Sequence, residues 1–502
     1  MATPRAGRRE WAGLAVLALP TFLLAIDNGV LFLAVPAISE DLRPDATQLL
    51  WIMDSYGFMM AGFLVTMGTL GDRIGHRRLL MIGATAFGIA SALAAYAPTA
   101  ELLIAGRVAL GIAGATLMPA TLALISHIFT DARQRGVAIA VWSSAFTAGA
   151  ALGPVVGGAL LEAFWWGAAF LIGLPVMVAL LILAPLLLPA PTPSGAGRLD
   201  PLSVALSLAA ILPVVYGLKE LANDPGVLAV VALVVGLGFG VVFVRRQRTL
   251  AHPLLDLSLF ADRAFRGGLV ILLAGTGAMV GLYLVISQYL QLIAEMTALE
   301  AGLWLVPGVV STLVGSMLAP LAARRVSPGV VVAGGLAVST VGYLLLVFTD
   351  PADGLAMPML GFTLAMFGNG PLGALIIDLM VGSAPPGRAG SASSLAETGG
   401  EFGAALGVAT FGSIAAAVYT GVLDGPGDTV EATAAAAEDL PPAEAAGLLD
   451  ASRDAFTAGL GAVAGVGAAV VAGLAVVALV ALRHVGPTRN NDHEIELEKT
   501  PG

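Results

Sequence analysis

Long runs of apolar residues, separated by short polar segments, dominate this chain. Each run is continuous rather than alternating, and each is close to the roughly 20 residues that a helix needs to cross a bilayer. Because backbone groups find no water inside a bilayer, such a run predicts a spanning helix. The pattern predicts an all-α polytopic membrane protein with fourteen spans, at residues 11–36, 49–70, 79–97, 102–126, 137–160, 165–188, 201–219, 226–244, 267–292, 302–322, 329–348, 356–381, 395–419 and 456–482.

The lengths of the polar loops between the spans divide the spans into groups of six, two and six. The expected domains are an N-terminal six-helix bundle at 1–188, a two-helix insert with linkers at 189–266, a C-terminal six-helix bundle at 267–482 and a tail at 483–502. The second bundle includes an acidic outer segment at 420–455, interpreted as a solvated loop with some helix or as a weak cation-attracting rim. Two similar halves around a binding site are a common plan of transporters.

The basic residues predict the orientation. If the N-terminus is cytoplasmic, 20 of the 24 Lys and Arg residues fall in cytoplasmic segments, three fall outside, and Arg107 lies within a span. Loops that stay in the cytoplasm are rich in Lys and Arg. We therefore expect a multi-pass protein of the cell membrane with both termini in the cytoplasm.

Composition removes several classes of function. Hydrophobic residues make up 58% of the chain and charged residues 12%, whereas a soluble protein carries roughly 25% charged residues. The chain has no cysteine, and its two lysines fit no nucleotide-binding loop. Its 5 histidines have no metal-binding spacing. We expect no cofactor, no metal, no enzymatic activity and no nucleic-acid partner.

Three motifs point to a family. The joint between spans 2 and 3 is a glycine-rich basic turn in which Asp72 is the only acid, and this acid is expected to latch one conformation by contacting an arginine or a helix N-terminus. The turn contains Gly68, Gly71, Asp72, Arg73, Gly75, Arg77 and Arg78, which resemble the signature loop of the major facilitator superfamily. Arg107, Gly111 and Gly114 resemble the motif of that superfamily in span 4.

Span 5 carries a glycine and proline pattern that bears on the direction of transport. Gly149, Gly153, Pro154, Gly157 and Gly158 resemble the antiporter motif, which is found mainly in exporters. Small residues at this spacing let helices approach closely, and proline allows a bend. The alternative interpretation is a generic packing motif.

Two further segments narrow the resemblance. The runs 49–56 and 396–403 are similar to the fourteen-helix drug:proton antiporters, and within them to the quaternary-ammonium-compound resistance type. The resemblance covers essentially the whole chain. It departs at 319–329, where the second copy of the signature loop has decayed, and in span 10, which lacks an acid that some relatives use for divalent cations.

The resemblance implies the major facilitator fold and a proton-coupled multidrug efflux antiporter working by alternating access. Its partners would be protons, membrane lipid and amphipathic, mainly cationic substrates such as quaternary ammonium compounds, dyes and antibiotics, and it would function as a monomer. The alternatives are an exporter of one metabolite or antibiotic, or an osmolyte/proton symporter on the same fold. A membrane enzyme is disfavoured because no nucleophile and base constellation occurs.

Ionisable residues inside spans are the first candidates for the site, because a charge at mid-bilayer costs at least about 2.5–3.5 kcal/mol. Asp27, Asp54 and Arg107 lie at similar depths in spans 1, 2 and 4. An Asp27–Arg107 contact is therefore expected, either for proton coupling or as a structural pair. Asp54 is expected to act in the site or to reach interfacial water.

The second half supplies three more carboxylates. Glu397 and Glu401 are four residues apart in span 13, so they face the same way. We expect them to bind protons or substrate, unless Glu397 belongs only to the cytoplasmic mouth. Asp378, near the end of span 12, is expected to pair with Arg388 in the following loop.

Aromatic side chains complete the predicted pocket, because aromatic faces attract lipophilic cations. The candidates for lining it are Trp51, Tyr56, Trp142, Phe146 and Tyr289. Packing or interfacial anchoring is the alternative role for each.

Overall fold

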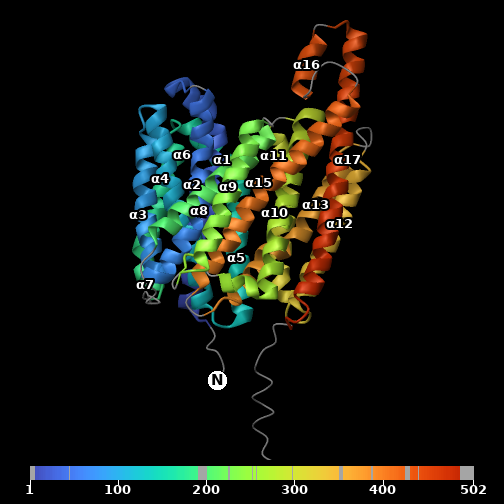
Figure 1. The fold of residues 1–502 in the computed structure, drawn as a ribbon. Helices are drawn as coiled ribbons and strands as arrows, with labels where there is room; N and C mark the ends of the chain where they lie inside the picture. The colour runs from blue at the N-terminus through green and yellow to red at the C-terminus, as the bar shows by residue number, and fades with distance from the viewer. Residues whose placement is uncertain are drawn as a thin grey trace, which may run out of the picture.

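The computed structural model describes residues 6–44, 46–189, 200–223, 226–250, 253–255, 257–296, 298–349, 354–385, 388–423, 430–438 and 440–486. Within these residues the chain forms a bundle of long, roughly aligned helices and no strand (Figure 1). The predicted all-helical fold is confirmed. The predicted tail lies outside the described residues from 487 onward.

The first seven helices belong to the first predicted bundle. They are α1 (Arg8–Leu42), α2 (Ala46–Ile74), α3 (His76–Ala95), α4 (Ala100–Ile128), α5 (Ala132–Ala163), α6 (Ala168–Leu171) and α7 (Gly173–Leu187). The predicted insert contains α8 (Pro201–Asn223) and α9 (Val227–Gln247).

The rest of the chain adds helices with two π-helical turns. They are η1 (Leu257–Ala261), α10 (Arg263–Gln288), η2 (Tyr289–Ile293), α11 (Ala298–Ala322), α12 (Pro328–Val347), α13 (Ala356–Pro371), η4 (Leu372–Ile376), α14 (Ile377–Gly382), α15 (Ala389–Val422), α16 (Val430–Glu438) and α17 (Pro442–Ala481). The turns η2 and η4 continue α10 and α13 as π-helix.

Twelve helices of the described chain are long and apolar enough to cross a membrane. The helices α2 and α5 are not among these twelve, although they have 29 and 32 residues. The structure therefore shows a multi-pass helical protein, and the count of fourteen spans in a 6+2+6 layout stays a prediction.

Each predicted span falls on a helix, and most helices extend beyond the prediction. The largest difference is in the acidic segment 420–455, for which the sequence predicts mainly a loop. Here α16 and the start of α17 rise above the rest of the bundle (Figure 1). Alanine has the highest helix propensity, which explains helix in this alanine-rich segment. The hydroxyl of Tyr419 joins Thr433 and Ser452 at 2.8 Å each and ties α16 and α17 to the end of α15.

The opposite end of the bundle carries most of the arginines. It contains the start of α1, the α2–α3 turn and the α4–α5 turn, and we call it the basic end. Aspartate side chains at this end cap the N-termini of α5 and α10. Asp131 accepts from the backbone N–H of Gln134 at 3.0 Å, and Asp262 accepts from that of Phe265 at 2.9 Å. Such caps satisfy N–H groups that have no partner inside the helix.

The helices α8 and α9 form a hairpin, and α8 also contacts α2 and α15. An ion pair closes the hairpin at its base, where Arg246 donates to Asp200 at 2.7 Å. This hydrogen bond holds the pKa of the Asp200 carboxyl well below its usual range. The hairpin therefore lies along the seam between α2 of the first half and α15 of the second.

Small residues allow α10 and α15 to pack backbone to backbone. A Cβ on Gly403 would meet the carbonyl oxygen of Leu273, and one on Gly407 would meet that of Gly277. Close approach through glycine is a common way for helices to associate in membranes.

We predict that Gly407→Leu destabilises the protein by about 1–3 kcal/mol, because the added side chain overpacks this contact. Thermal unfolding in detergent, followed by tryptophan fluorescence, should give a lower midpoint. The control is Gly473→Leu on α17, where a Cβ meets nothing within 4 Å. Equal midpoints for the two variants would contradict the proposed contact.

Candidate functional site

A buried ion pair joins α1 to α4. Nη1 of Arg107 donates to Oδ2 of Asp27 at 3.0 Å, and the two side chains are only 1% and 7% exposed. An unpaired charge in a membrane interior costs several kcal/mol, so the pairing relieves both groups. The contact expected from the depths of these residues is present.

The same guanidinium also holds α2. Its Nε donates to the carbonyl of Ile52 at 3.1 Å, and its Nη2 donates to that of Met53 at 3.5 Å. Its Cζ lies 4.6 Å from the centroid of the Tyr56 ring. Guanidinium carries five N–H donors, which lets one side chain connect three helices. Arg107 thus links Asp27 of α1 to the backbone of α2.

Glu397 and Glu401 lie on the face of α15 that is turned away from α10. The glycines of α15 that face α10 include Gly399, Gly403 and Gly407. At about 100° per residue, Glu401 projects from nearly the opposite side of α15 and Glu397 from its flank. Glu401 is close enough to Tyr56 for its charge to act on that hydroxyl. Glu401 of the second half therefore lies within electrostatic range of Tyr56, whose ring contacts Arg107 of the first half.

The helix α15 starts earlier than predicted. It begins at Ala389, so Glu397 lies about two turns inside the helix. Whether Glu397 belongs to the site or only to the mouth of the span stays a prediction. Glu397, Glu401 and Asp54 are all partly buried.

Asp72 connects the halves at the basic end. Its carboxylate accepts from the backbone N–H of Gly390 at 2.9 Å, from that of Ser391 at 3.0 Å and from the Ser391 hydroxyl at 3.0 Å. Its Oδ1 also lies 3.0 Å from Nε2 of His76. Of the two partners expected for Asp72, the structure shows a helix N-terminus, that of α15.

Two positions near Asp72 require glycine for different structural reasons. A Cβ on Gly68 would meet the carbonyl oxygen of Gly390, so this glycine permits the contact between α2 and α15. Gly75 has φ of 91° at the start of α3, a conformation that favours glycine. Arg77 donates to the carbonyl of Leu188 at 3.1 Å and Arg73 is buried.

A second contact between the halves corrects one prediction. The sequence predicts a pair between Asp378 and Arg388, but the structure pairs Asp378 with Nε of Arg135 on α5, at 2.6 Å. The π-helical turn η4 immediately precedes α14 and changes the helical phase of α14 relative to α13. The carboxylate of Asp378 therefore faces the first half. Nearby, Ser143 donates to the carbonyl of Gly373 at 2.8 Å.

The helix α5, which contains predicted span 5, packs on α1 through part of the glycine and proline motif. A Cβ on Gly149 would meet the carbonyl oxygen of Phe22, and one on Gly157 would meet Val30 at 3.0 Å. A Cβ on Gly158 would meet nothing within 4 Å, and Gly153 is buried. Pro154 lies within α5, and its side chain is outside the described residues. Gly149 and Gly157 thus make close contact with α1.

The five predicted lining aromatics occupy different surroundings. Tyr56 and Tyr289 are buried, and Phe146 is partly buried against the core. Nε1 of Trp142 donates to Thr121 at 3.1 Å, which joins α5 to α4.

Trp51 instead faces outward. It is 40% exposed and lies in an apolar groove of about 290 Å³ between α2, α8 and α9, with Phe58 and Tyr216. A lining role for the five aromatics stays a prediction.

Sequence reasoning missed which helix N-terminus Asp72 binds, and it missed Arg135 as the partner of Asp378. The sequence pattern places Arg135 only in a basic loop and gives Ser391 no role. The small residues that begin α15, Gly390 and Ser391, were the available signal for a close helix contact. In the described residues no three or more His, Asp or Glu side chains gather as a metal site would require.

Comparison with known proteins supports a transporter. Residues 17–408 match the model of the Major Facilitator Superfamily. The chain is 44% identical over 474 residues to the multidrug efflux pump LfrA of Mycolicibacterium smegmatis, covering 92% of this chain and 94% of that protein. It is 34% identical over 473 residues to the methyl viologen resistance protein SmvA of Salmonella typhimurium, covering 89% and 93%.

Solved transporters share the fold at low identity. The TM-score is 0.58 with the human organic anion transporter MFSD10, at 17% identity over 92% of this chain and 99% of that one. It is 0.55 with the Escherichia coli fucose:proton symporter FucP, at 15% identity over 94% and 99%. Because the family match spans most of the chain and its relatives align along nearly their whole length, the chain belongs to the major facilitator superfamily of membrane transporters.

Proposed function

We propose that the protein is a proton-coupled multidrug efflux antiporter that exports amphipathic, mainly cationic compounds by alternating access. The observation that carries this proposal is the buried Asp27–Arg107 pair, whose arginine contacts Tyr56, a residue within electrostatic range of Glu401 on α15. The 44% identity to a protein named as a multidrug efflux pump supports the same direction of transport.

The carboxylates would couple the two fluxes by competition. A carboxylate in a membrane interior is stabilised by a proton or by a cation, and the cost of leaving it charged and alone is several kcal/mol. If Glu401 and Glu397 accept either a proton or a cationic substrate, the two occupants exclude each other. Proton entry would then drive substrate release on the far side.

Tyr56 provides a polar group at the same place. Among the described residues its buried hydroxyl has no hydrogen-bond partner, and its ring lies against Arg107. Buried polar groups normally have a partner. We infer that this hydroxyl serves polar substrate groups or protons passing between Asp27 and Glu401.

The contacts at the basic end fit one state of an alternating-access cycle. With the basic end in the cytoplasm, the contacts of Asp72 and of Asp378 would close the cytoplasmic side and leave access from outside. An acid at a helix N-terminus contributes about 0.3–1 kcal/mol, and up to about 2 kcal/mol when partly buried. Such contacts favour one state and remain weak enough for ligands to shift the equilibrium.

The remaining expectations belong to the same proposal. We infer fourteen spans in a 6+2+6 arrangement with both termini in the cytoplasm, in the cell membrane, and a functional monomer. The aromatics Trp51, Tyr56, Trp142, Phe146 and Tyr289 are proposed to assist substrate binding.

The first test measures energy coupling in proteoliposomes with an imposed pH gradient. We expect ethidium and methyl viologen to accumulate against their gradients only while the proton gradient persists, with no nucleotide present. An ionophore that collapses the gradient should abolish accumulation. Accumulation that ignores the gradient but requires ATP would contradict the proposal.

The second test addresses the proposed role of Asp72 as a latch, that is, a contact that holds the basic end closed. Asp72→Asn removes the charge at the start of α15, so we expect the population open at the basic end to rise about fivefold, which corresponds to about 1 kcal/mol. The chain has no cysteine, so spin labels can be placed at Ala132→Cys and Val330→Cys to follow the distance between the halves. The control is Asp262→Asn, which removes the same charge at the N-cap of α10, where the aspartate accepts from its own helix. An unchanged distance distribution in Asp72→Asn would refute the latch.

The third test separates the two carboxylate sites. Asp27→Asn should abolish proton-driven export of every substrate, because it replaces the titratable carboxylate beside Arg107 with a neutral amide. Glu401→Gln should reduce export of cationic substrates about tenfold or more and spare neutral ones. Substrate-induced proton release from the solubilised protein measures both effects, and a thermal melt checks that each variant is folded. Equal losses of cationic and neutral substrates in Glu401→Gln would contradict the division.

A further inference from the structure

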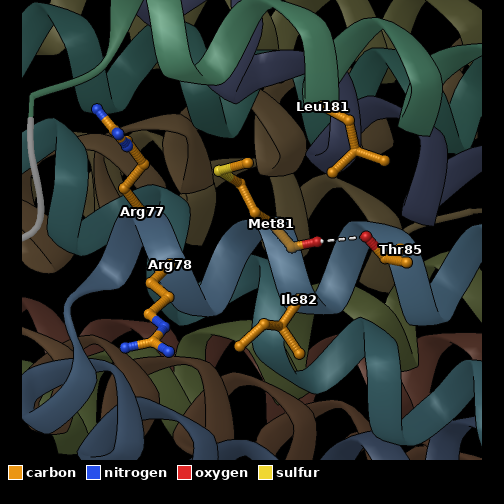
Figure 2. A pocket seen from close by; sticks show the side chains of 6 residues that line it. All are labelled: Arg77, Arg78, Met81, Ile82, Thr85 and Leu181. Atoms are coloured by element: carbon orange, nitrogen blue, oxygen red, sulfur yellow. Dashed lines mark hydrogen bonds between the residues drawn. The ribbon is translucent and has the colours of Figure 1, made fainter.

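A pocket opens between α3 and α7 at the basic end, away from the Asp27–Arg107 pair. Its volume is about 340 Å³, and it is lined by Arg77, Arg78, Met81, Ile82, Thr85 and Leu181. Figure 2 shows the two arginines at one end and Leu181 and Thr85 at the other. The lining therefore changes from cationic to apolar along the pocket.

The cationic end of the pocket lies beside the last turn of α7. Arg77 donates to the carbonyl of Leu188 at 3.1 Å, and Arg9 of α1 donates to that of Leu186 at 2.9 Å. Each guanidinium has five donors, so these bonds position the side chains and leave donors for a ligand. Arg78 is exposed beside them. None of the lining residues is acidic, so this end favours an anion.

The apolar part faces the outside of the bundle. Ile82 is 51% exposed, and Ile182 and Leu186 on the neighbouring face of α7 are 60% and 62% exposed. The hydroxyl of Thr85 donates back to the carbonyl of Met81 at 2.9 Å, which satisfies it within α3. In a membrane protein, exposed apolar side chains of this kind contact lipid tails.

We propose that this pocket binds an anionic phospholipid, with its phosphate at Arg77 and Arg78 and an acyl chain along Met81, Ile82 and Leu181. Arginine is well suited to phosphate, because its planar donors match phosphate oxygens. A free phosphate would leave the apolar part unfilled, and a zwitterionic lipid would bring a cationic amine to a cationic end. The occupant is therefore one molecule with both features.

Native mass spectrometry of the detergent-purified full chain tests the proposal. The ligands to add are phosphatidylglycerol, phosphatidylcholine of the same chain length, and inorganic phosphate. We expect one phosphatidylglycerol molecule to bind tightly and phosphatidylcholine to bind more weakly. Inorganic phosphate should not displace the bound lipid. Equal binding of the two lipids, or displacement by phosphate, would overturn the proposal.

Variants locate the site. Arg78→Gln should weaken the first phosphatidylglycerol about fivefold, the factor expected for one arginine at an anionic headgroup, and Met81→Trp should weaken it by filling the apolar part. The control is Arg248→Gln, an exposed arginine beyond α9 at the same end and outside the pocket. If Arg78→Gln and Arg248→Gln reduce binding equally, the basic end attracts lipid without a defined site, and the proposal is wrong.

Discussion

The burial of the Arg107 charge is the constraint on which the first half of this protein depends. A guanidinium keeps its proton under all physiological conditions, so burial can be tolerated only by supplying partners. The chain supplies Asp27 from α1, two carbonyls from α2 and the face of Tyr56. These partners fix the relative positions of three helices near the membrane interior. They also make Asp27 the one member of the cluster that can change its charge by taking a proton. In the proposed mechanism, a single buried cation would thus both organise the helices and make their arrangement sensitive to protonation of Asp27.

The contacts between the halves have a different role in the proposed alternating-access cycle, because each cycle would break and re-form them. Asp72 binds the start of α15 through two buried backbone N–H groups and one buried hydroxyl, and the side chains of Arg135 and Asp378 are 20% and 13% exposed. A buried carboxylate that loses its hydrogen-bond donors is destabilised, so opening this end would require compensating contacts in the other state. The Asp27–Arg107 pair lies within one half, whereas the contacts of Asp72 and Asp378 lie between the halves. In the proposed cycle the first pair would persist while the contacts between the halves break and re-form.

The sequence predicts the fold well because hydropathy reports directly on contact with lipid. Every predicted span coincides with a helix, and the depths of Asp27 and Arg107 along their spans were enough to anticipate their contact. The partner of Asp378 was not predictable in this way. Neighbours in sequence favoured Arg388, whereas the π-helical turn η4 sets the phase of α14 and directs the carboxylate to Arg135. The extent of α16 and α17 was also missed, because hydropathy distinguishes lipid from water and not helix from loop within an aqueous segment. The predictions from sequence were therefore wrong where the rotational phase of a helix, or local helix propensity, decided the structure.

In the proposed cycle, the α8–α9 hairpin would shield a moving seam from lipid. The helix α8 contacts both α2 and α15, through side chains such as Phe58, Val215 and Phe402. Apolar contacts are non-directional, so they lose little free energy when one surface slides over another. Hydrogen bonds, by contrast, weaken steeply when their geometry changes. At this seam the directional contacts of Asp72 can define discrete states while the apolar contacts of α8 keep the interface covered as those states interchange. The two-helix insert is thus compatible with motion because its packing against the halves is mainly apolar.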